Sequence, residues 1–170
     1  MVPARRLATS QTSILPAIDG STTYRGWSDL VGTVRRLLDY ERGSAPAVQL
    51  NVAELDETIN PGDHSDHRMT AKAVLDAAAG LSCARRLHYV DYASSRLPVN
   101  LSAEDRDMES SVVAVTAAGL LALDHSSIWA RYYQSYLGKN YFRVEEGKGR
   151  CEAARPQLAH SLPSVVRKSR

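Results

Sequence analysis

The chain lacks long apolar stretches and has few cysteines, and both scarcities restrict its class. No apolar run approaches the ~20 residues that a membrane-spanning helix needs. No apolar stretch follows Arg5 and Arg6, so we expect no secretory signal. Cys83 and Cys151 are far apart and have no ligand-type neighbours, which argues against a zinc knuckle and against a disulfide framework. We therefore expect reduced thiols in a cytoplasmic protein without a transmembrane segment.

A dominant charge of one sign is also lacking. The 21 basic and 19 acidic residues are intermixed and leave a net charge of +2. A nucleic-acid-binding domain concentrates Lys and Arg on one element, so we expect no nucleic-acid partner. The 44 % apolar and 24 % charged residues are ordinary for a globular protein, and 170 residues suffice for one domain with a core.

What the chain does contain is an alternation of helix and strand patterns. Residues 1–20 read as an irregular lead-in, 21–145 as an α/β domain, and 146–170 as a loosely ordered tail. The expected elements are a helix over 28–43, a strand over 47–52, a helix over 69–79, a strand over 86–92, a long helix with a capping box at Ser102 and Asp105, a helix over 128–137, and an extended piece over 141–144. This order predicts a parallel sheet with flanking helices, whose ligands sit outside the carboxyl ends of the strands.

The segment Gly62-Asp63-His64-Ser65-Asp66-His67 lies at such a strand end, directly before a helix. One imidazole can bind a divalent metal, the other can stabilise a developing charge, and an aspartate can fix the second ring's tautomer. A blander interpretation stays open. Asp63, Ser65 and Asp66 can simply cap the helix while both histidines are solvated.

The six-residue motif, followed by Thr70-Ala71-Lys72-Ala73-Val74, resembles the second conserved motif of the PIG-L/LmbE family of zinc-dependent N-acetyl-sugar deacetylases. Two flanking segments are similar to the same branch, namely 19–24 and 134–143. The resemblance covers roughly residues 12 to 145.

The resemblance implies a Rossmann-like fold and hydrolysis of the acetamide on an N-acetylglucosamine-type substrate. It makes His67 a zinc ligand, His64 the group that stabilises the oxyanion, and Asp66 the residue that holds His64 in place. In this chemistry zinc lowers the pKa of a bound water and polarises the carbonyl.

One departure from the family pattern is large. The family's first motif, His-Pro-Asp-Asp-Glu, supplies two further zinc ligands and the general base, and this chain has no His-Pro and no Asp-Asp pair. That motif and the first strand would precede residue 1. We therefore expect a sheet missing its N-terminal strand, an incomplete zinc ligand set, an inactive or nearly inactive isolated chain, and possible association through an exposed sheet edge. The alternatives are a non-catalytic remnant that acts as a binding or interaction module, and a metal-free helical binding domain.

Overall fold

The computed structural model describes residues 3–125 and 133–152, which form a mixed α/β fold with two sheets. A small antiparallel hairpin pairs β1 (Ile14–Pro16) with β2 (Thr23–Arg25). The main sheet has the order β3-β4-β5. In it β3 (Val48–Ala53) runs parallel to β4 (Ala84–Tyr89), and β5 (Phe142–Glu145) runs antiparallel to β4.

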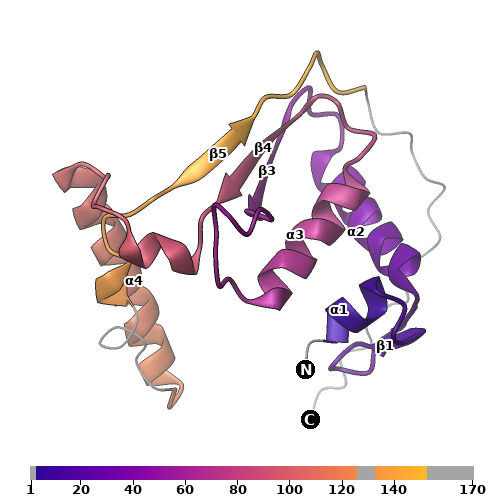
Figure 1. Cartoon of the computed structure of the whole chain (residues 1–170), viewed down its shortest axis with the longest axis horizontal. Helices are drawn as coiled ribbons and strands as arrows, with labels where there is room; N and C mark the ends of the chain where they lie inside the picture. The colour runs from indigo at the N-terminus through magenta and orange to yellow at the C-terminus, as the bar shows by residue number, and fades with distance from the viewer. Residues whose placement is uncertain (1–2, 126–132, 153–170) are drawn as a thin grey trace, which may run out of the picture.

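The helices lie on one side of this sheet and at one end of it. They are α1 (Pro3–Ala8), α2 (Trp27–Arg42), α3 (Ser65–Ala77) and α4 (Ala103–Ala122), with short 3₁₀ helices η1 (Tyr92–Arg96) and η2 (Tyr133–Ser135). Figure 1 shows α2 and α3 beside one another next to β3 and β4, with α4 at the opposite end of the molecule. α3 is the crossover that connects the two parallel strands, as parallel pairing requires.

The core lies between α3 and the sheet. Leu50 of β3 and Ala84 of β4 are buried together with Leu81 from the connecting loop, and Leu38 of α2 packs against them. Along β3, the buried Leu50 and Val52 alternate with exposed polar side chains. Because successive strand residues point to opposite faces, this alternation shows that only one face of β3 is covered.

Most expected elements are confirmed, and the α/β class with them. Ser102 Oγ accepts a hydrogen bond from the Asp105 N–H at 3.1 Å, so Ser102 is the N-cap of α4, and the Asp105 carboxylate accepts a hydrogen bond from the Ser102 hydroxyl. The helix after the first strand begins earlier than expected, at Ser65, which places His67 in its first turn. The expectation of a wholly parallel sheet is wrong for β5, which pairs with β4 in the antiparallel sense. The helix α4 lies between them in the chain, but at one end of the molecule rather than across the sheet (Figure 1). The first half of the expected helix over 128–137, residues 128–132, lies outside the described residues, and the second half contains the 3₁₀ helix η2.

Both ends of the described chain are more ordered than expected. The lead-in contains α1, whose Leu7 is only 1 % exposed, and β1. At the other end, Cys151 N–H donates to Pro46 O, and Lys148 N–H donates to Ser82 O.

The expectation of reduced thiols is wrong. Cys83 and Cys151 form a disulfide across a sequence separation of 68 residues. Cys83 precedes β4 and Cys151 follows β5, so the antiparallel pairing of these strands brings the two Cα atoms to 5.1 Å. Disulfides persist mainly in oxidising compartments, so the cysteines no longer support a cytoplasmic location.

Within 3–125 and 133–152, no helix combines the length and the apolar character that crossing a bilayer requires.

Candidate metal centre

The histidine loop lies where the strand order predicts it. A cavity of about 270 Å³ opens beyond the carboxyl ends of β3 and β4, and its lining includes Val52, His67, Thr70 and Asp91. His67 comes from the first turn of α3 and Asp91 from the segment that follows β4. Because β3 and β4 are parallel neighbours, their carboxyl ends meet at one edge of the sheet, and the loops that follow them share this cavity.

Three side chains converge at this edge. Asp63, His67 and Asp91 each offer a ligand atom, and these atoms all lie within 4.8 Å of one another. His67 Nδ1 lies 2.7 Å from Asp63 Oδ1 and 3.6 Å from Asp91 Oδ2. Both carboxylates therefore face the same ring nitrogen. This is the one such cluster of three or more ligand-type side chains in the part of the chain that the structure describes.

Asp63 is held rigidly. Its side chain is 0 % exposed, and its Oδ1 accepts the His64 backbone N–H at 2.7 Å while Oδ2 accepts Asn60 Nδ2 at 3.1 Å. Both of its oxygens are therefore hydrogen-bonded, and its position is set before any cation binds.

Asn60 connects the two loops that carry the cluster. It is 0 % exposed, and its amide Nδ2 donates to Asp63 Oδ2 and, at 3.4 Å, to the backbone oxygen of Glu54. Its Oδ1 accepts the backbone N–H of Asp91 at 3.2 Å. One buried side chain thus ties the end of β3, the histidine loop and the end of β4 together.

The loop after β3 is further fixed by an ion pair. Glu54 is 2 % exposed, and Arg143 of β5 donates to it through Nε at 2.8 Å and through Nη2 at 3.2 Å. Burial by itself raises the pKa of Glu54, but the Arg143 hydrogen bond, the Asp56 N–H and the Arg143 charge outweigh burial and hold the pKa below its usual value. Glu54 is therefore a charged structural anchor.

The electrostatics of the cluster favour a cation. Burial raises the pKa of Asp91, the nearby Asp63 carboxylate raises it further, and His67 partly opposes the shift. Two carboxylates, the fully buried Asp63 and the 38 % exposed Asp91, face one imidazole and concentrate negative charge there. A divalent cation between them relieves this repulsion.

The donor set fits zinc and similar divalent ions. It contains three protein ligands, one imidazole nitrogen and two carboxylates, which is the number that a catalytic zinc takes. Ligands around a tetrahedral zinc lie about 3.3 Å apart, given metal–ligand bonds of about 2.0–2.1 Å. The 3.6 Å separation suits this spacing, whereas the 2.7 Å contact between His67 Nδ1 and Asp63 Oδ1 must lengthen slightly if both atoms bind the same ion.

The two other residues expected at the site lie on its rim. His64 is the N-cap of α3, and its Nδ1 accepts the Asp66 backbone N–H at 3.2 Å. In the neutral ring this leaves the proton on Nε2, which makes Nε2 a hydrogen-bond donor. The ring centroids of His64 and His67 are 5.8 Å apart, and Asp66 Oδ2 lies 3.6 Å from His64 Nδ1. The pairing of Asp66 with His64 thus exists, although mainly through the backbone.

Sequence reasoning missed Asp91 and Asn60 and gave Asp63 only a capping role. Asp91 follows the second strand, so the strand-end rule that pointed to the histidine loop could have found it as well. Asn60 stands in a polar loop and has no sequence signal, because its importance comes from burial alone.

The fold and the cluster together define an α/β protein with a candidate metal centre at the carboxyl ends of two parallel strands. Comparisons with protein-family models, with curated proteins and with solved structures find no match to this chain.

Proposed function

We propose that this chain is a PIG-L/LmbE-like, zinc-dependent deacetylase domain whose substrate carries an N-acetylglucosamine-type acetamide. The observation that carries the proposal is the placement of the motif residue His67 beside Asp63 and Asp91 in a strand-end cavity. A role in helix capping or exposure to solvent would not require His67 to lie beside two carboxylates. The motif's resemblance to the family supplies the reaction, and the geometry supplies a place for the ion.

In this proposal His67, Asp63 and Asp91 hold the zinc. The ion would supply the usual chemistry of zinc hydrolases, by activating water and polarising the carbonyl. His64 would donate its Nε2–H to the negative charge that forms on the carbonyl oxygen, and the Asp66 N–H keeps the required tautomer. Asn60 holds the two loops so that the ligands do not need to reorganise.

A Rossmann-like arrangement with a missing N-terminal strand belongs to the same proposal. In the described residues β3 is an edge strand, since β4 pairs with only one of its sides. A further strand from another polypeptide could pair with this edge.

The second candidate is a non-catalytic binding module, and one observation favours it. Asp91 is the only carboxylate that lines the strand-end cavity in the described chain, and the proposal uses it as a ligand. The family's general base belongs to a motif that the sequence lacks. On this reading the site binds a cation and a sugar but does not turn the sugar over.

Metal analysis combined with an amine-release assay tests the proposal. The chain is purified, loaded with zinc and dialysed, and its metal content is measured beside that of His67→Ala and of His125→Ala, an exposed histidine outside the cluster. We expect about one zinc per chain, lost in His67→Ala and kept in His125→Ala. Equal metal content in all three proteins would refute the metal centre. Release of free amine from an N-acetylglucosamine glycoside then separates the deacetylase from the binding module.

A further inference from the structure

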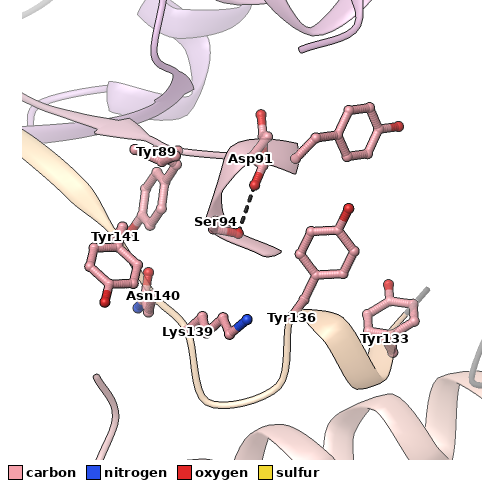
Figure 2. Close-up of a pocket in the computed structure, with 10 residues that line it drawn as sticks. Tyr89, Asp91, Ser94, Tyr133, Tyr136, Lys139, Asn140 and Tyr141 are labelled. Carbon is pink, nitrogen blue, oxygen red and sulfur yellow. Dashed lines mark hydrogen bonds between the residues drawn. The ribbon is translucent and has the colours of Figure 1, made fainter. Parts of the chain in front are cut away.

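A second and larger cavity adjoins the candidate metal centre. Its volume is about 520 Å³, and its walls are rich in tyrosine, with Tyr89, Tyr133, Tyr136, Tyr141, Asp91 and Lys139 among the lining residues. Figure 2 shows Tyr133 and Tyr136 on one side of the opening, Tyr89 and Tyr141 on the opposite side, and Asp91 with Ser94 between them. Asp91 lines both cavities, so this residue of the candidate metal centre borders each of them.

The walls of this cavity are tied together by hydrogen bonds. Lys139 Nζ donates to the backbone oxygens of Ser95 and Ser135, at 2.6 Å and 2.7 Å. The Tyr141 hydroxyl donates to Pro98 O at 2.7 Å. These bonds join the segment after β4 to the segment before β5. The cavity is therefore preformed, as ligand sites usually are.

Several polar groups around the cavity remain available. Tyr89, Tyr133 and Tyr136 are half-buried, and their hydroxyls have no hydrogen-bond partner among the described residues. A tyrosine hydroxyl normally finds a hydrogen-bond partner when it is buried, so a ligand that covers these three should pair with them. The cavity thus offers flat aromatic faces together with a rim of unused hydroxyls and a carboxylate.

We propose that this cavity binds a pyranose ring that is linked to the acetamide-bearing ring, so that the substrate is a glycan of at least two rings. The proposal rests on the proposed function for the position of the acetamide. A pyranose presents an apolar C–H face and a rim of hydroxyls, which matches aromatic faces edged by phenol groups and Asp91. An acyl chain would leave these polar groups unpaired. A phosphate would face the Asp91 carboxylate, while the Lys139 ammonium is already held by two carbonyl oxygens.

The path between the two sites is short. The ring of Tyr92 lies 5.3 Å from the ring of His67, and Asp91 is its immediate neighbour in the chain. A ligand that lies against the tyrosines therefore extends over Tyr92 toward the cluster. This continuity distinguishes the cavity from an unrelated surface hollow.

Calorimetric titration with N-acetylglucosamine and with N,N′-diacetylchitobiose tests the proposal on the zinc-loaded chain. We expect the disaccharide to bind about tenfold more tightly than the monosaccharide. Tyr136→Ala should reduce disaccharide affinity about tenfold, to the level of the monosaccharide, and leave zinc binding unchanged. Tyr136→Phe keeps the ring face and should retain most of the affinity, which separates stacking from misfolding. Tyr40→Ala removes a tyrosine that is 80 % exposed on α2 and should have no effect.

Equal binding of the two sugars, or no effect of Tyr136→Ala, would overturn the proposal. Cellobiose, which carries no acetamide, distinguishes the failure of this cavity from the failure of the deacetylase. If cellobiose binds in a Tyr136-dependent manner while the acetamide is never hydrolysed, the cavity is confirmed and the proposed reaction is wrong. If zinc binds at His67 but no sugar depends on Tyr136, the metal centre stands and the cavity proposal falls.

Discussion

Replacing Asn60 with alanine should loosen the metal centre without touching any proposed ligand. The side chain is fully buried and makes three hydrogen bonds, to the Asp63 carboxylate, to Glu54 O and to the Asp91 N–H. A neutral hydrogen bond contributes about 1 kcal/mol to stability, a bond to a charged group contributes about 1.5–3 kcal/mol, and buried groups left unpaired add their desolvation cost. The variant should therefore lose roughly 3–5 kcal/mol of unfolding free energy.

The effect on cation binding should be separable from this loss of stability. Groups that support metal ligands typically change metal affinity about 10–100-fold when they are mutated. We expect zinc affinity to fall within that range for Asn60→Ala, measured by competition with a chelating dye at a temperature where the variant is folded. Gln11→Ala, which removes an exposed side-chain amide, serves as the control and should change neither quantity.

Two results would refute this reasoning. A change in unfolding free energy below about 1 kcal/mol in urea titration would show that the three hydrogen bonds do not act as a buried hub. A large loss of stability with unchanged zinc affinity would show that Asn60 supports the fold but does not position the ligands.

Three further predictions follow from the same contacts. Asp91→Asn removes a proposed ligand and also the repulsion between residue 91 and Asp63. Without zinc, the variant should melt at a slightly higher temperature than the wild type, and zinc should raise its melting temperature much less. An equally large zinc-induced rise in the variant would exclude Asp91 as a ligand. The raised pKa of Asp91 means that the folded protein keeps this proton to higher pH than the unfolded chain does. The stability of the wild type should therefore fall as the pH rises above 3.8 and through the raised pKa. Asp91→Asn should lack that decline. Cys151→Ser opens a loop of 68 residues and should lower the unfolding free energy by about 2–4 kcal/mol. Reductant should lower the stability of the wild type by the same amount and leave the variant unchanged, and a wild type that is insensitive to reductant would contradict the prediction. Arg143→Met leaves the buried Glu54 carboxylate without its guanidinium and should cost about 2–4 kcal/mol at pH 7, somewhat below a fully buried pair because Arg143 is half exposed. Because the pKa of Glu54 is lowered in the wild type, that stabilisation is present above 4.5 and lost as pH falls through the lowered pKa, so urea titrations of variant and wild type should converge in acid.

The exposed apolar side chains of α4 form a separate feature of this fold. Met108, Val112 and Val115 lie on one stripe of the helix and are 66 %, 59 % and 75 % exposed. Beside this stripe the helix contacts the segment after η2, where Glu109 Oε2 accepts the Gly138 N–H at 2.6 Å. Because apolar residues occupy an exposed stripe of α4, the sequence of this helix does not divide clearly into an apolar and a polar face.

Local sequence alone determined most of the elements and the position of the histidine loop. Apolar spacing located α2, β3 and β4, and the Ser102 capping box located the start of α4, because these signals depend on neighbours a few residues apart. The alternation of helix and strand was enough to place His67 at a strand end. The motif's chemistry could then be named before any contact was known.

Only the tertiary structure decided which residues share the site with His67. Asp91 meets it because β4 lies beside β3 in parallel, and Asn60 matters because folding buries it between their ends. The direction of β5 and the Cys83–Cys151 bond likewise depend on how distant segments pair. Such contacts join residues far apart in the chain, and their free energy comes from burial and mutual geometry that no local pattern encodes.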